Sequence, residues 1–374
     1  MRIAFDVSYI QRNRAGIGGH ALQLARALRD HDTRNEYVFH GWSFRLDEDE
    51  IGTLQAPNVS LSVKRIPGDV KRFYWNRLRK PPIEAFVGTV DIFHSTDPMV
   101  PPARHAKRIA TVHDCAYKKF PALFEPRVLA WDAYVQRALR VADAIVVPSE
   151  QTMHDVMEFF KVEKARLHII HPPVDDIFSY RRDNCGSTED MSRISKPYVL
   201  FVGTIEPRKN LLSIIKAFEH VRREQRDDVD LVIAGKKGWL FEETLHAIET
   251  SSEKASIRYR EYVSEEELAC LYRQAICFVY PSLYEGYGFP VLEAMASGVP
   301  VITSNNSAMR EFADGVALLV PPDNIHDIAD AIHMLVTNEV RRVEMKQRGL
   351  HVVKQFSSRQ AAQALLTLYG ALKQ

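Results

Sequence analysis

Residues 280–302 read YPSLYEGYGFPVLEAMASGVPVI, and this stretch decides the fold of the second half of the chain. An apolar strand ends at Tyr280, Gly286 and Gly288 allow a tight turn, a helix begins by Pro290, and a second apolar strand follows from Val299. This order is typical of a parallel sheet covered by helices. The turn also brings backbone amides and a helix N-terminus to one place, which favours an anionic ligand.

The same alternation of short apolar runs with longer segments of helical periodicity extends along the whole chain, so we predict the α/β class. In the first half the predicted strands are residues 2–7, 37–42, 59–66, 91–95, 108–113, 144–148 and 168–172. In the second half they are residues 198–202, 230–234, 257–263, 277–280, 299–303 and 317–320.

A polar stretch without apolar periodicity interrupts the pattern between residues 176 and 196. We therefore predict two doubly wound, Rossmann-like domains that face each other across a cleft, where ligands bind beyond the carboxyl ends of the strands. The predicted boundaries are an N-terminal domain at 1–177, a linker at 178–197, a C-terminal domain at 198–355 and a helix at 356–374 that packs across the domain junction.

Composition excludes several classes of function. The 374 residues include 49 Lys and Arg against 48 Asp and Glu, so no overall positive field favours nucleic acid. Four cysteines without paired two-residue spacing predict reduced, mostly buried thiols. The N-terminus lacks the apolar region of a signal peptide, and no run reaches the roughly 18 apolar residues of a spanning helix, so we expect a cytoplasmic protein.

Two further segments carry candidate binding groups. Residues 203–211, GTIEPRKNL, follow a predicted strand and place Arg208 and Lys209 at a helix start, where they could stabilise a diphosphate without a metal. A solvated basic pair in a turn is the alternative. Gly16, Gly18 and Gly19 form a glycine loop that could bring amides to an anion, or that could simply permit a tight turn.

Glu285 and Glu293, separated by seven residues, resemble the signature of the retaining glycosyltransferases of the GT-B fold, known as glycosyltransferase group 1 or family 4. The accompanying glycines, the following AMASG and the strand VPVIT make the match specific, and the resemblance covers nearly the whole chain. It implies that Glu285 contacts hydroxyls of the donor sugar and that Glu293 accepts hydrogen bonds from the ribose. The N-terminal domain would then bind the acceptor and the C-terminal domain the nucleotide sugar.

The resemblance assigns further roles by position. His113 would reach the donor sugar, Asp114 would hold its loop or the acceptor, and the turn-borne pair Arg208 and Lys209 would bind the diphosphate. The backbone at Val263 would read the nucleobase. The other donor-binding residues implied are Gly16, Gly18, Gly19, Gly286, Tyr287, Gly288 and Phe289. Some relatives carry arginine where this chain has Thr204, so the resemblance leaves this additional phosphate contact open.

Within the family, the chain most resembles bacterial mannosyltransferases of polysaccharide and O-antigen assembly. This implies a hexosyltransferase that uses GDP-mannose without a cofactor or metal, with UDP-sugars as alternative donors, and a glycan or polyprenyl-linked acceptor. Three other functions stay open: a GT-B sugar-nucleotide epimerase, a non-catalytic scaffold, and a dinucleotide oxidoreductase, which would need a different glycine fingerprint.

A basic and aromatic segment precedes residue 81. Seven Lys and Arg residues lie between 61 and 80 against the single acid Asp69, and they are interleaved with Phe73, Tyr74 and Trp75. Such a segment suits an anionic lipid surface, so we predict a peripheral contact through residues 64–80 at the inner face of the cytoplasmic membrane. The alternative is a solvated helix whose aromatic face joins the core.

Overall fold

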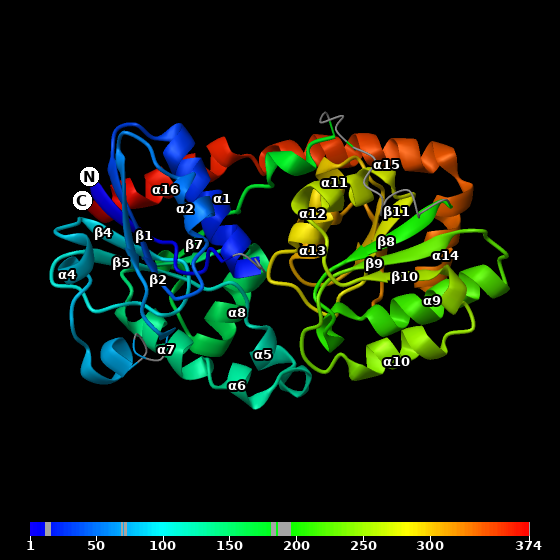
Figure 1. Ribbon diagram of the computed structural model, residues 1–374, viewed down its shortest axis with the longest axis horizontal. Helices are drawn as coiled ribbons and strands as arrows, with labels where there is room; N and C mark the ends of the chain where they lie inside the picture. The colour runs from blue at the N-terminus through cyan, green and yellow to red at the C-terminus, as the bar shows by residue number, and fades with distance from the viewer. Residues whose placement is uncertain (12–15, 69, 71–72, 181–184, 186–195, 374) are drawn as a thin grey trace. The chain divides into compact units, whose positions relative to one another are not determined.

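All thirteen predicted strands are present, and they form two parallel sheets of seven and six strands, which confirms the α/β class (Figure 1). The structure is a computed structural model that describes residues 1–11, 16–68, 70, 73–180, 185 and 196–373. Most strands are buried on both faces, as in β8 (Tyr198–Val202), and this explains why they read as continuous apolar runs.

The first sheet has the order β3-β2-β1-β4-β5-β6-β7. Its strands are β1 (Arg2–Asp6), β2 (Glu36–Trp42), β3 (Val59–Lys64), β4 (Ile92–Ser95), β5 (Lys107–Thr111), β6 (Ala144–Val147) and β7 (Leu167–Ile169). The second sheet has the order β10-β9-β8-β11-β12-β13. Its other strands are β9 (Asp230–Ala234), β10 (Ile257–Arg260), β11 (Cys277–Tyr280), β12 (Val301–Ser304) and β13 (Leu318–Val320).

Contacts within the chain group it into two compact units. The first unit comprises Met1–Lys119, Pro126–Pro173 and the chain from Phe356 on, and the second comprises Phe120–Glu125 and Val174–Gln355. Of the predicted linker, residues 181–184 and 186–195 lie outside the described part of the chain.

Helices cover the first sheet. They are α1 (Gly16–His31), α2 (Glu48–Gly52), α4 (Glu84–Val87), α5 (Ala116–Lys119), α6 (Pro126–Leu129), α7 (Asp132–Val141), α8 (Glu150–Phe160) and α16 (Ser358–Lys373). The predicted C-terminal helix is α16, and it packs beside α1 in the core of the first unit (Figure 1). Its buried side chains, Ala361, Leu365 and Leu368 among them, recur at helical spacing, as its sequence predicts.

In the second unit, α9 (Leu211–Arg223), α10 (Glu242–Thr250) and α14 (Ile325–Thr337) cover one face of the sheet (Figure 1). The opposite face carries α11 (Glu265–Gln274), α12 (Phe289–Ala296) and α13 (Met309–Ala313), with α15 (Glu339–Val352) packed against α12. The strand order reverses between β8 and β11, which are hydrogen-bonded neighbours. In doubly wound sheets, ligands bind beyond the carboxyl ends of the strands at such a point.

The four cysteines, Cys115, Cys185, Cys270 and Cys277, are free thiols, as predicted, and three of them are buried. No helix within the described ranges is long and apolar enough to cross a membrane.

Candidate active site

Two loops at the point where the strand order reverses carry the strongest sequence signals. After β8, the chain passes Gly203 into a 3₁₀ turn, η6 (Pro207–Lys209), which directly precedes α9. After β11, it runs from Pro281 to Glu285 before α12 begins. The amide of Leu283 donates to the carbonyl of Arg208 at 2.9 Å, so the two loops are hydrogen-bonded to each other.

Arg208, Lys209 and Glu285 are brought together in this structure. Arg208 Nη1 lies 2.8 Å from Glu285 Oε2, and Lys209 Nζ lies 2.6 Å from Glu285 Oε1. Arg208 Nη2 also donates to Oε1 of Glu206 at 2.6 Å. We call these two carboxylates and two cations the charge quartet.

Two hydroxyl groups also form hydrogen bonds with Glu285. The Tyr280 hydroxyl donates to Glu285 Oε1 at 2.9 Å and accepts from Lys209 Nζ at 2.6 Å. The Ser282 hydroxyl lies 2.9 Å from the same carboxylate oxygen. Glu285 is thereby held by groups from both loops, and its side chain has little freedom to rotate.

Burial and charge act against each other in the quartet. Burial alone would raise the pKa of Glu285, but Arg208 and Lys209 outweigh it and lower that pKa to about 2. Burial, with the Arg208 charge, lowers the pKa of Lys209. Burial raises the pKa of Glu206, although Arg208 and Lys209 oppose that rise. Glu285 is therefore fully ionised at neutral pH.

Gly288 starts α12 in a conformation that favours glycine. Its φ is +103°, and a Cβ at this position would lie 3.0 Å from Cγ of Met309. The first amides of a helix lack carbonyl partners in the preceding turn, so the amide of Phe289 is suited to an anion. Pro290 has no N–H, and the amides of Val291 and Leu292 donate to the carbonyl of Gly288. Gly286, Tyr287 and Gly288 are buried in this turn.

Glu293 lies in α12 and has partners of its own. The hydroxyl of Tyr272, from α11, donates to Glu293 Oε2 at 3.1 Å. Burial raises the pKa of Glu293 to about 7, and the Tyr272 hydrogen bond only partly offsets this. Unlike Glu285, Glu293 titrates near neutrality.

Val263 is half-buried in the loop between β10 and α11. The next residue, Ser264, caps α11 by accepting a hydrogen bond from the Glu267 amide at 3.2 Å.

The predicted glycine loop of the first unit is helical instead. Gly16, Gly18 and Gly19 belong to the first turn of α1, and residues 12–15 before them lie outside the described part of the chain. A first turn still presents amide groups without intrahelical partners, so its capacity for an anion comes from the helix terminus rather than from a loop.

His113 follows β5 in the first unit. Its Nε2 lies 2.7 Å from the carbonyl oxygen of Thr96, and because a carbonyl only accepts, Nε2 carries the hydrogen. Burial lowers the pKa of His113, so the ring is neutral with Nδ1 as an acceptor. The ring packs edge-on against His20 at 4.6 Å between centroids. Asp114 accepts from the Ala116 amide at 3.0 Å at the start of α5.

Sequence reasoning missed four residues that support the site. Glu206, Ser282 and Tyr280 lie within the two motifs but were given no role there, and Tyr272 lies outside both motifs. An acid two positions before Arg208 could have indicated a partner for the guanidinium.

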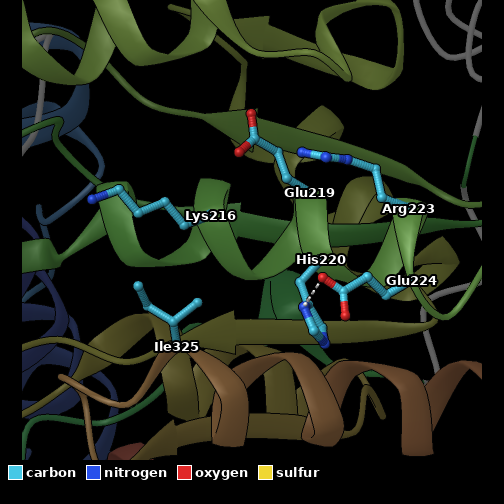
Figure 2. A pocket seen from close by; sticks show the side chains of 6 residues that line it. All are labelled: Lys216, Glu219, His220, Arg223, Glu224 and Ile325. Carbon is cyan, nitrogen blue, oxygen red and sulfur yellow. Dashed lines mark ion pairs between the residues drawn. The ribbon is translucent and has the colours of Figure 1, made fainter.

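A surface hollow on the second unit lies elsewhere. It is lined by side chains of α9, of the residue that follows α9 and of the start of α14: Lys216, Glu219, His220, Arg223, Glu224 and Ile325. Figure 2 shows His220 and Glu224 facing each other, with His220 Nδ1 3.2 Å from the Glu224 carboxylate. The hollow contains none of the predicted site residues. Within the described residues, no cluster of three or more His, Cys, Asp or Glu side chains could hold a metal ion.

Comparison with known proteins identifies the family. The family Glycosyl transferases group 1 matches residues 191–352, and Glycosyltransferase Family 4 matches residues 14–178. O-antigen chain mannosyltransferase B of Escherichia coli is 27% identical over 387 residues, which cover 100% of both chains.

Solved structures share the fold at lower identity. Sucrose-phosphate synthase from Thermosynechococcus elongatus has a TM-score of 0.78 at 18% identity, covering 99% of this chain and 98% of that one. HepE of Anabaena, in complex with UDP and glucose, has a TM-score of 0.75 at 14% identity, covering 99% of this chain and 100% of that one. With both halves matched by family models and the fold shared with these enzymes, the chain belongs to the GT-B glycosyltransferases of group 1 and family 4 and is a glycosyltransferase.

Proposed function

We propose that this glycosyltransferase is a hexosyltransferase that moves mannose from GDP-mannose onto a glycan or polyprenyl-linked acceptor in cell-surface polysaccharide synthesis. The observation that carries the proposal is the charge quartet, which places two cations beside a helix start at the reversal of strand order. Similarity to the O-antigen mannosyltransferase over the full chain favours mannose as the sugar. HepE was solved with UDP and glucose, so a UDP-sugar is the alternative donor.

In this proposal the chemistry is a substitution at the anomeric carbon with retention. The bond from that carbon to the diphosphate breaks, the bond to the acceptor oxygen forms on the same face, and the acceptor proton passes to the leaving phosphate. Arg208 and Lys209 stabilise the negative charge that grows on the diphosphate, and Glu285 orients the sugar and stabilises positive charge on its ring. His113 contacts the sugar, and Asp114 holds its loop or the acceptor. The other residues that we propose for donor binding are Gly16, Gly18 and Gly19 in the first unit and Val263 and the 286–289 turn in the second.

A donor panel tests the proposal. We expect GDP-mannose to bind to the full chain in calorimetry more tightly than UDP-glucose, UDP-galactose or UDP-N-acetylglucosamine. Nucleotide release should require an acceptor glycan. If a UDP-sugar binds more tightly than GDP-mannose, the donor is the UDP-sugar. If no nucleotide sugar binds, the proposal is refuted.

Transfer should not depend on a divalent cation, because Arg208 and Lys209 supply the positive charge that a metal provides in other sites. We expect turnover in excess EDTA to stay within about twofold of that in magnesium, the spread of ordinary assays. Loss of turnover in EDTA that magnesium or manganese restores would contradict this prediction.

Glu293 should make donor binding dependent on pH. In this proposal, a ribose hydroxyl of the donor donates a hydrogen bond to the ionised carboxylate of Glu293. Because the pKa of Glu293 is raised to about 7, donor binding at lower pH requires the carboxyl group to lose its proton first. We expect Glu293→Ala to weaken donor binding by about 1–3 kcal/mol at pH 8. Below pH 7, the ratio of the parent's donor affinity to that of the variant should fall by up to about tenfold per pH unit.

The measurement is calorimetry of intact GDP-mannose, whose phosphates do not titrate near neutrality. Glu293→Gln is the matched control, because it keeps an acceptor oxygen without a titrating group. A constant ratio of parent to variant affinity from pH 5.5 to 8 would remove Glu293 from the donor site.

We also propose that the first unit contacts an anionic membrane through residues 64–80. In the turn η1 (Phe73–Leu78), Phe73, Tyr74 and Leu78 are 54%, 42% and 48% exposed. Trp75 does not belong to this surface: it is 1% exposed and packs against Trp42 at 4.8 Å between centroids, so it anchors the turn to the core. Lys71 and Arg72 lie outside the described residues.

Aromatic and basic side chains together suit the lipid interface. Arg77, Arg79 and Lys80 are exposed beside the three apolar side chains. We expect the parent to pellet with liposomes containing phosphatidylserine, and a variant with Arg77, Arg79 and Lys80 changed to Ser to stay largely in the supernatant. Each cation near an anionic surface contributes about 1 kcal/mol, so three should shift binding by roughly 100-fold.

A matched control removes three exposed cations from the second unit. Lys216, Arg223 and Lys254 are exposed there. Changing these three residues to Ser should leave pelleting unchanged. Equal pelleting of the parent and the triple basic variant would leave the segment without a membrane role.

A further inference from the structure

Glu206 stands between the strand and the basic turn that follows it, and its contacts give it more than a packing role. It is 3% exposed, and its Oε1 accepts from Arg208 Nη2 at 2.6 Å. The other arm of the same guanidinium, Nη1, donates to Glu285 Oε2 at 2.8 Å. The planar guanidinium of Arg208 thus joins two buried carboxylates, and Glu206 fixes the orientation of its two NH₂ groups.

The charges of the quartet cancel when all four groups are ionised. Glu206 and Glu285 carry two negative charges, and Arg208 and Lys209 carry two positive ones. In a buried site such charges act more strongly than in water. Without the carboxylate of Glu206, the site would hold one net positive charge and would attract a diphosphate more strongly.

Resting on the proposed function, we propose that Glu206 is a positioning residue of the donor site that also limits its affinity for the diphosphate. Its hydrogen bond holds Arg208 against Glu285, which keeps the guanidinium directed at the departing phosphates. Its charge offsets one cation, so the product nucleoside diphosphate, which carries more negative charge than the donor, is not retained.

Two substitutions separate these effects. Glu206→Gln keeps an oxygen that can accept from Arg208 but removes the charge, and we expect it to bind GDP about fivefold or more tighter than the parent at pH 8. Its rate in a single turnover should stay within about threefold of the parent's, while steady-state turnover falls because product release is slower. Glu206→Ala loses the acceptor as well, and its single-turnover rate should fall by about 30-fold or more.

Asp230→Asn is the control for removal of a buried carboxylate. Asp230 is 1% exposed and pairs with Arg258 at 2.7 Å, but it begins β9 at the amino end of the same sheet, away from the site loops. We expect this variant to bind GDP as the parent does. A thermal melt of each variant shows whether it is folded.

The outcomes distinguish the inference from the function on which it rests. If Glu206→Gln binds GDP no more tightly than the parent, or if Glu206→Ala matches its single-turnover rate, the role of Glu206 is refuted while the proposed function stands. If the parent binds neither GDP nor UDP, both are refuted. Tighter GDP binding by Glu206→Gln is not expected of a merely structural residue, whose loss would weaken binding or leave it unchanged.

Discussion

Replacing Glu285 with glutamine should lower turnover by about 100-fold or more, because an oriented charge that stabilises a transition state typically contributes that much. The substitution keeps the size of the side chain and an oxygen for the hydroxyls of Tyr280 and Ser282, but not the negative charge that faces Arg208 and Lys209. GDP binding should persist and become tighter, as for Glu206→Gln, since both cations remain and one negative charge is removed. Steady-state kinetics with calorimetry of GDP measures the two effects separately.

The same substitution should reduce stability in a way that depends on pH. The pKa of Glu285 is depressed from 4.5 to about 2, so its carboxylate stabilises the folded chain above pH 4.5, and this contribution is lost as pH falls toward 2. At neutral pH the pKa difference corresponds to roughly 3 kcal/mol. Denaturant unfolding should therefore separate parent and variant more at pH 7 than at pH 3.

Glu253→Gln is the matched control, because Glu253 pairs with Arg222 at 3.2 Å in the same unit and is not part of the site. It should retain full turnover. Parent-like turnover by Glu285→Gln would mean that the carboxylate has no role in the transition state, and the assignment of the site would have to change.

The fold was largely predictable because both sheets are parallel and covered on both faces. Strands such as β8 and β11 have to be apolar along their whole length, so their limits can be read from hydrophobicity alone. The first turn of α1 was harder, since glycines at a helix N-terminus and glycines in a loop look alike in sequence. Trp75 was placed on the surface for a similar reason: one short segment holds both buried and exposed aromatic side chains.

The candidate site was predictable only as far as its motifs reach. The two glutamates and the Arg-Lys pair belong to separate segments, and it is the β8–β11 pairing that brings Arg208 to Glu285. That pairing depends on strand order, which a single sequence does not specify. Nor does the sequence distinguish Glu285, whose cations lower its pKa, from Glu293, whose burial raises it.

Arg208→Ala should strongly reduce both stability and turnover. Arg208 is the shared partner of Glu206 and Glu285, which are 3% and 7% exposed, so its removal leaves two buried carboxylates with Lys209 as the cation of the quartet. Breaking a buried ion pair typically costs about 3–5 kcal/mol of unfolding free energy. Turnover should fall by about 1,000-fold or more, as when an arginine that stabilises a departing phosphate is lost.

Arg208→Lys divides this effect into charge and geometry. Lysine keeps the positive charge, so it should recover much of the lost stability, but it lacks the planar fork that joins both carboxylates. Its turnover should therefore stay well below that of the parent. Arg341→Ala is the control: Arg341 pairs with exposed Glu344 at 3.2 Å, and such surface pairs contribute about 0–1 kcal/mol.

Urea unfolding and single-turnover kinetics on the three variants provide the measurement. If Arg208→Ala were as stable as Arg341→Ala, the two carboxylates would have to be satisfied without the guanidinium, for instance by protonation of Glu206, whose pKa burial already raises. Unfolding at pH 5 and pH 8 tests this, because a protonated Glu206 would make Arg208→Ala lose stability as the pH rises. A variant equally stable at both pH values and fully active would show that neither the carboxylates nor the diphosphate depends on Arg208.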